Sequence, residues 1–140
     1  MSLVSAAGRR VLVVDDEPAV LELVVTRLAI AGYQTYQARN GREAIQRLAD
    51  VIPDGLVLDI NMPVVDGFEV LLHMQRQRLT ARTAVMVLTA RNRPDDVARA
   101  IELGAIDFLA KPFKDTQLLV RVARLLRRGK QTSDEMYLSD

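Results

Sequence analysis

Short apolar runs alternate with segments of helical periodicity along most of the chain, and this alternation limits the folds open to it. Apolar and β-branched residues predict strands at residues 11–14, 33–38, 56–58, 84–88 and 106–109. Helical patterns follow each of these runs. Five strand–helix units in succession predict a parallel sheet with helices on both faces, because parallel strands need crossover connections.

The composition of the runs predicts the order of strands in that sheet. Runs 11–14, 56–58 and 84–88 are almost entirely apolar, as central parallel strands are, whereas 33–38 is more polar and suits an edge. With right-handed crossovers, a flavodoxin-like (βα)5 doubly wound sheet of order 2-1-3-4-5 meets these requirements. The expected fold class is therefore α/β.

Capping and turn residues indicate where the helices begin and end. Proline suits the first turn of a helix, asparagine its N-cap and glycine the position after its last turn. The residues that fill these roles are Pro18, Asn40 and Pro94 at helix starts and Gly32, Gly104 and Gly129 at helix ends. Residues 9–128 are thus expected to form one domain. The polar segment 129–140 is expected to be a linker leading toward an effector domain absent from this chain.

The composition excludes several kinds of chemistry. The 140 residues include no Cys, which rules out disulfides, zinc–thiolate sites and haem thioether bonds. The net charge of +1 gives no overall field toward nucleic acid or membrane. The first apolar run, 11–14, is too short for a signal peptide or a membrane span. A cytoplasmic protein with no membrane partner is predicted.

Reactive side chains follow four of the predicted strands: Asp15 and Asp16, Asp59, Thr89 and Lys111. In a doubly wound sheet, ligands bind beyond the carboxyl ends of the strands, where the strand order reverses. Singly, each of these residues has an ordinary explanation as a helix cap, a turn residue or a solvated charge. Their joint placement at one rim favours a binding site.

Three carboxylates at one rim repel one another unless some are protonated or a cation lies among them. Oxygen donors without Cys or clustered His suit a hard ion such as Mg²⁺, or Mn²⁺. A carboxylate beside such an ion can act as a nucleophile toward phosphorus and form an acyl phosphate. Lys111 would then pair with a phosphoryl oxygen, and Thr89 would donate its hydroxyl to another.

Four stretches, taken together and in this order, resemble the receiver domain of two-component response regulators. They are Val11–Glu17 (VLVVDDE), Val57–Gly67 (VLDINMPVVDG), Leu88–Ala90 (LTA) and Lys111–Phe113 (KPF). The resemblance covers about residues 9–128. It implies a phosphoacceptor switch, rather than an enzyme with turnover, that receives its phosphoryl group from a sensor histidine kinase. Only phosphorylation from small donors and self-dephosphorylation would be the domain's own chemistry.

The resemblance assigns the metal and phosphorylation roles. Asp59 corresponds to the phosphoacceptor. Asp16 and Asp59 correspond to direct ligands of Mg²⁺ (or Mn²⁺), Asp15 to a residue that acts nearby or through water, and Asn61 to one whose backbone carbonyl completes the protein ligands. Asn61 also falls at a position that tunes the lifetime of the acyl phosphate, as does Arg91.

The same resemblance assigns the switch residues. Thr89 and Lys111 correspond to the pair that senses the phosphoryl group, and the Lys111–Pro112 bond corresponds to a cis peptide bond that directs the Lys inward. Phe108 occupies the position of the switch aromatic. Many members of the family have Tyr there, so an output that requires a Tyr hydroxyl is not expected.

The last helix, 118–128 (LLVRVARLLRR), resembles the subfamily whose receivers precede a winged-helix DNA-binding domain, and Met136–Asp140 is similar to the opening strand of such a domain. The resemblance implies transcriptional control, with DNA bound only through the domain absent here. It also implies a homodimer, formed on phosphorylation through the fourth helix, fifth strand and fifth helix, in which Asp107 and Arg121 fit one cross-subunit ion pair.

A second charged pair that is usual in such dimers has no counterpart, because Val97 and Gln117 fall at its positions. The only histidine, His73, lies in the third predicted helix, away from the strand ends, and a surface position is expected for it.

Three alternatives remain open. The chain could be a stand-alone regulator that relays its signal by protein contact. It could be an aspartate-nucleophile phosphatase, although such enzymes place a second Asp two residues after the nucleophile, where this chain has Asn61. A flavin- or nucleotide-binding module of the same fold would need a glycine-rich loop after the first strand, where this chain has Asp15–Pro18 (DDEP).

Overall fold

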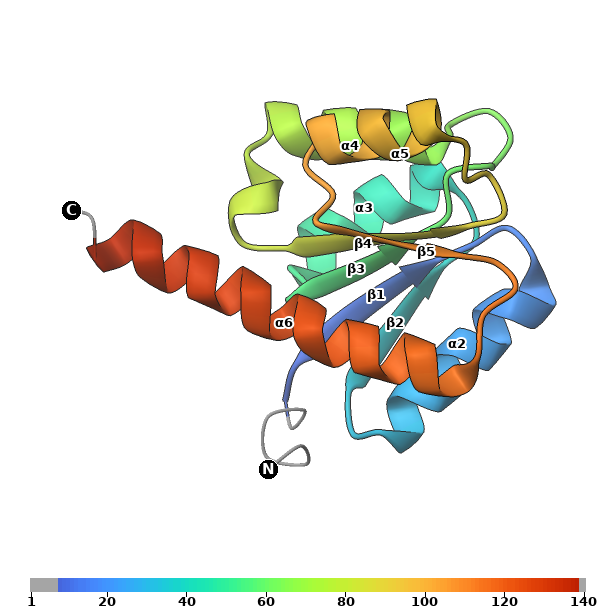
Figure 1. Ribbon diagram of the computed structural model, residues 1–140, viewed down its shortest axis with the longest axis horizontal. Helices are drawn as coiled ribbons and strands as arrows, with labels where there is room; N and C mark the ends of the chain where they lie inside the picture. The colour runs from blue at the N-terminus through green and yellow to red at the C-terminus, as the bar shows by residue number, and fades with distance from the viewer. Residues whose placement is uncertain (1–7, 139–140) are drawn as a thin grey trace.

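The structure, a computed structural model, describes the backbone of residues 8–138 and the side chains of residues 8–129. A sheet of five parallel strands has the order β2-β1-β3-β4-β5, which confirms the predicted flavodoxin-like α/β topology (Figure 1). The strands are β1 (Arg10–Val14), β2 (Gln34–Ala38), β3 (Gly55–Leu58), β4 (Ala84–Thr89) and β5 (Asp107–Ala110). Each overlaps its predicted run, and β2 is an edge strand as expected.

Helices cover both faces of the sheet. In Figure 1, α2 and α6 lie against one face, and α3, α4 and α5 lie against the other. The helices are α2 (Pro18–Ile30), α3 (Gly41–Val51), α4 (Gly67–Arg76), α5 (Pro94–Glu102) and α6 (Asp115–Leu138), with a short 3₁₀ helix, η1 (Leu79–Ala81), before β4. No helix within residues 8–138 is long and apolar enough to cross a bilayer.

Alternating side chains of the strands supply two separate cores. In β1, Val11 and Val13 belong to the cluster packed with α2 and α6, whereas Leu12 and Val14 belong to the cluster packed with α3, α4 and α5. All four side chains are at most 1% exposed. This two-sided burial explains why the central strands are continuous apolar runs instead of alternating ones. It also holds the carboxyl ends of the strands in a fixed arrangement.

Local chemistry sets most helix ends as predicted. The side chain of Asn40 accepts a hydrogen bond from the Glu43 amide at 2.9 Å and begins α3. Gly32 and Gly104 follow α2 and α5 with φ of 104° and 111°, a left-handed conformation that glycine adopts without steric cost. Asp66 caps α4 in the same way as Asn40, by accepting the Glu69 amide.

The prediction that the last helix ends at Gly129 is wrong, because α6 continues to Leu138. Met136–Leu138 therefore lie in a helix and not at the opening of a strand, and residues 139–140 lie outside the described part of the chain. Gly129 serves close packing: a Cβ atom there would lie 2.7 Å from the Cβ of Ala84. The proposal that 129–140 connects to an effector domain stays a prediction.

Substituting Gly129 with Ala should reveal this packing constraint. In an otherwise unconstrained helix, Gly→Ala stabilises by about 1 kcal/mol. Here the new methyl meets Ala84, and overpacking costs about 1–3 kcal/mol, so Gly129→Ala should lower the free energy of unfolding in urea. In an Ala84→Gly background the same substitution should raise it. An equal stabilisation in both backgrounds would contradict the packing explanation.

Candidate functional site

Two buried aspartates lie where the strand order of the sheet reverses. Asp15 follows β1 and Asp59 follows β3, and their exposed fractions are 2% and 3%. Because β1 and β3 are neighbours, the two carboxyl ends lie side by side; the Asp59 amide donates to the Val14 carbonyl at 3.0 Å. The topology thus brings together two acidic residues that are far apart in sequence.

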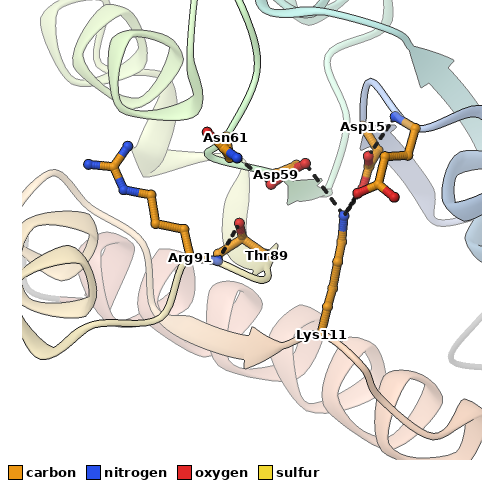
Figure 2. A network of polar contacts seen from close by, with 7 residues as sticks. Asp15, Asp59, Asn61, Thr89, Arg91 and Lys111 are labelled. Atoms are coloured by element: carbon orange, nitrogen blue, oxygen red, sulfur yellow. Dashed lines mark hydrogen bonds and ion pairs between the residues drawn. The ribbon is translucent and has the colours of Figure 1, made fainter.

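Lys111, which follows β5, reaches across the pocket to both aspartates. Its Nζ lies 2.8 Å from Oδ2 of Asp15, 3.1 Å from Oε1 of Glu17 and 3.5 Å from Oδ2 of Asp59 (Figure 2). Its backbone amide donates to the Thr89 carbonyl at 2.9 Å, which fixes the start of the loop. The Lys111–Pro112 peptide bond is cis.

The loop after β3 holds the Asp59 side chain in place. Oδ1 of Asp59 accepts the Asn61 amide at 3.1 Å, while Oδ2 faces Lys111, so both carboxylate oxygens have partners. The loop closes through a hydrogen bond from the Gly67 amide to the Ile60 carbonyl at 2.9 Å. A Cβ at Gly67 would lie 2.6 Å from the Ile60 Cα, so only glycine permits this approach of backbone to backbone.

Burial and charge shift the pKa of Asp15 and of Lys111. Burial raises the pKa of the Asp15 carboxyl, and the negative charge of Asp59 adds to this, despite opposing hydrogen bonds from Lys111 and the Glu17 amide. Burial alone would lower the pKa of Lys111. The hydrogen bond to Asp15, the charge of Asp59 and the hydrogen bond to Glu17 outweigh burial and raise it, so the side chain is an ammonium at neutral pH.

The pocket has the donor chemistry of a site for a hard cation. Carboxylate oxygens of Asp15, Glu17 and Asp59 lie within 4.8 Å of one another. When ionised, three carboxylates and one ammonium leave two negative charges, which a divalent cation would balance. Oxygen donors of this kind suit Mg²⁺ or Mn²⁺. The residues present therefore fit the predicted cofactor.

Asp16 does not belong to this group of three carboxylates. Its side chain is exposed, and it lines a groove of about 330 Å³ together with Asp15, Leu21 and Gln37. The assignment of Asp16 as a direct metal ligand, with Asp15 acting nearby, stays a prediction. So does the role of the Asn61 carbonyl; the Asn61 side chain is exposed.

Thr89 ends β4, the strand next to β3, and is hydrogen-bonded to Arg91. Thr89 is fully buried, and its hydroxyl accepts the Arg91 amide at 3.2 Å. The Arg91 guanidinium contacts Asp96, with Nε 3.0 Å from Oδ1. Figure 2 shows the Arg91 side chain extending away from Lys111.

The residues predicted for the switch and the dimer lie around β5. Phe108 is partly buried and packs against the core formed by α3, α4 and α5. Asp107 accepts a hydrogen bond from Arg121 of α6 at 2.8 Å. This ion pair forms within one chain, and the ion pair between subunits that the sequence predicts stays a prediction.

Sequence reasoning did not include Glu17 among the site residues, although Asp15–Glu17 is a continuous acidic run. The side chain is exposed, but its carboxylate reaches Lys111 from the first residue before α2. An acidic residue before a helix is usually explained by the helix dipole, which is why the run alone did not single out Glu17.

Fold and pocket together define a doubly wound α/β domain with a cation-compatible acidic pocket at its topological switch point. The sequence matches the response regulator receiver domain family over residues 11–123. Relatives include the DNA-binding dual master transcriptional regulator RpaA of Synechocystis, 40% identical over 119 residues, and the transcriptional regulatory protein PrrA of Mycobacterium tuberculosis, 41% identical over 124 residues. The matched parts cover 85% and 89% of this chain but 49% of RpaA and 52% of PrrA.

A solved structure of the chemotaxis protein CheY4 of Vibrio cholerae is similar to the chain as well. It has 33% sequence identity and a TM-score of 0.80, and the match covers 85% of this chain and 99% of CheY4. The chain belongs to the response regulator receiver domain family and is the receiver domain of a two-component response regulator. It spans about half the length of the curated relatives it matches.

Asp15→Asn should make the protein more stable at neutral pH. The raised pKa of Asp15 means that the carboxyl binds its proton more tightly in the folded state than in the unfolded chain, where its pKa has the ordinary value of 3.8. Stability is therefore lost as pH rises from 3.8 through the folded-state pKa. Asn cannot ionise and avoids this loss.

The measurement is the urea midpoint of wild type and Asp15→Asn at neutral pH and below pH 3.8, with exposed Asp50→Asn as the control. The gain of Asp15→Asn should be present at neutral pH and disappear in acid. A gain that is independent of pH would show that ionisation of Asp15 is not its cause.

Proposed function

We propose that Asp59 accepts a phosphoryl group from a sensor histidine kinase while Mg²⁺, or Mn²⁺, is held beside it. The observation that carries this proposal is the buried Asp59 carboxylate at the switch point of the sheet, facing the Lys111 ammonium and within reach of two further carboxylates. Membership of the receiver family supports it. The predicted ligands are Asp59, Asp16, Asp15 and the Asn61 carbonyl.

In the transfer, an oxygen of Asp59 bonds to phosphorus as the bond from phosphorus to the kinase histidine breaks. The imidazole nitrogen keeps the electron pair and takes up a proton. When bound, the divalent cation supplies positive charge that offsets repulsion between the carboxylates and the incoming phosphoryl group. Lys111 turns from the carboxylates to a phosphoryl oxygen as a charged hydrogen-bond donor. The domain itself catalyses no more than phosphorylation from small donors and its own dephosphorylation.

Phosphorylation would act as a switch through Thr89 and Phe108. The Thr89 hydroxyl, which now accepts the Arg91 amide, would donate to a phosphoryl oxygen, and Phe108 would turn inward. A second packing of α5, β5 and α6 would then be favoured over the first. Homodimers would form through this face, with Asp107 and Arg121 exchanging their internal ion pair for one across the interface.

The proposed output is control of a winged-helix effector domain. RpaA and PrrA are transcriptional regulators, and this chain matches about half of each. DNA would be bound only through the effector domain, not by the receiver, and a cytoplasmic location stays a prediction. A stand-alone regulator remains the second candidate, because the match covers 99% of CheY4. The coding sequence beyond Asp140 distinguishes the two.

Incubation with acetyl phosphate and Mg²⁺, followed by intact-mass measurement, tests the phosphoacceptor. The chain should gain one phosphoryl group, and Asp59→Ala should gain none. Chelation of the divalent cation should abolish the gain, whereas Asp50→Ala should leave it unchanged. No gain in the wild type, or a gain that survives Asp59→Ala, would count against the proposal. Sustained hydrolysis of a phosphate ester would instead favour the phosphatase alternative.

A further inference from the structure

Arg91 is held in place both by its backbone amide and by its guanidinium. Its backbone amide donates to Oγ1 of Thr89 at 3.2 Å, next to the Asp59 pocket. Its guanidinium is bound to Asp96 through Nε at 3.0 Å, and its Cζ lies 5.4 Å from the centroid of the Phe68 ring. The charged end is thus held by residues of α4 and α5. Figure 2 shows the Arg91 backbone beside Thr89, the residue that would sense a phosphoryl group.

The two groups that hold the guanidinium are buried. Phe68, in the first turn of α4, is 1% exposed, and Asp96, in the first turn of α5, is 8% exposed. The Phe68 ring also lies under the guanidinium of Arg99, with Cζ 4.2 Å from the centroid. Phe68 and Asp96 are therefore restrained by the packing around them, while the exposed guanidinium of Arg91 is the part that can move.

A released Arg91 would have a strong alternative partner. A guanidinium offers several N–H donors in a planar fork that matches phosphate oxygens, and such charge-assisted pairs are stronger than neutral hydrogen bonds. Because the Arg91 backbone adjoins Thr89, a phosphoryl group on Asp59 would be the nearest anion of this kind. A guanidinium placed over it would stand between the acyl phosphate and solvent water.

We propose that Asp96 and Phe68 are positioning residues that hold Arg91 away from the Asp59 phosphoryl group, so that water reaches it and the acyl phosphate is short-lived. The inference rests on the proposed phosphorylation of Asp59 and deepens it. Asp96 and Phe68 act only through Arg91. This distinguishes them from residues that alter the lifetime by changing the fold of α4 or α5.

The test is the decay of the acyl phosphate after the chain is labelled with acetyl phosphate and Mg²⁺ and the donor is removed. Intact-mass spectra at intervals give the half-life. Asp96→Ala should lengthen it about fivefold, the population shift expected when a partly exposed ion pair is lost. Phe68→Leu, which keeps an apolar side chain, should change it in the same direction, and Asp96→Asn by less than Asp96→Ala.

Each variant is compared with its counterpart in an Arg91→Ala background, where the positioning effect should vanish. A change of half-life that persists without Arg91, or no lengthening with Asp96→Ala, overturns the inference. Urea midpoints identify variants that fail to fold; if Asp96→Ala is among them, Asp96→Asn and Phe68→Leu decide the outcome by the same comparison. Absence of any phosphoryl group on the wild type would overturn the proposed function itself, a result separate from any change in lifetime.

Discussion

The Lys111 ammonium, placed among the carboxylates of Asp15, Glu17 and Asp59, is the interaction on which the rest of the site depends. It links the ends of β1, β3 and β5, which are distant in sequence and whose carboxyl ends lie at one edge of the parallel sheet, with β4 between β3 and β5. Without it, two nearly buried carboxylates would face each other with no opposing charge, and breaking a buried ion pair in this way is strongly destabilising.

The ion pair with Lys111 does not fully compensate the carboxylates. The pKa of Asp15 remains raised by burial and by the charge of Asp59 even with Lys111 in contact. The folded protein therefore maintains an excess of negative charge in a partly desolvated pocket. A divalent cation or a change of charge on Asp59 would act directly on this excess. In the proposed function, this is how chemistry at one aspartate would alter the balance between two packings of the molecule.

A close backbone contact restricts the loop that carries Asp59. Gly67 lets α4 begin against the Asp59–Ile60 backbone, where a methyl group would force the loop after β3 to move. Gly129 has a corresponding role at the opposite end of the sheet, where it lets α6 lie against Ala84 at the start of β4. The first of these contacts restricts the strand end whose side chain faces the pocket.

Strand order could be predicted because the runs at β1, β3 and β4 are apolar on both faces, a property that burial between two layers of helices requires. The gathering of Asp15, Asp59 and Lys111 followed from that order. The continuation of α6 past Gly129 could not be predicted, since glycine commonly ends a helix and its close approach to Ala84 involves a residue far away in sequence.

Which charged residues form ion pairs with each other could not be predicted from the sequence either. Asp107 and Arg121 were predicted to pair between subunits, whereas in the structure they pair within one chain. Nothing in the spacing of Phe68, Arg91 and Asp96 indicated that α4 and α5 would converge on one guanidinium. Contacts between helices depend on packing that local patterns do not encode.

Calorimetric titration with Mg²⁺ tests the central claim, that these carboxylates form one cation-binding pocket, most directly. The wild-type chain should bind Mg²⁺ at a single saturable site, Asp59→Asn and Asp15→Asn should each greatly weaken the binding, and exposed Asp50→Asn should leave it unchanged. Equal Mg²⁺ affinity in the wild type and in both pocket variants would contradict the account.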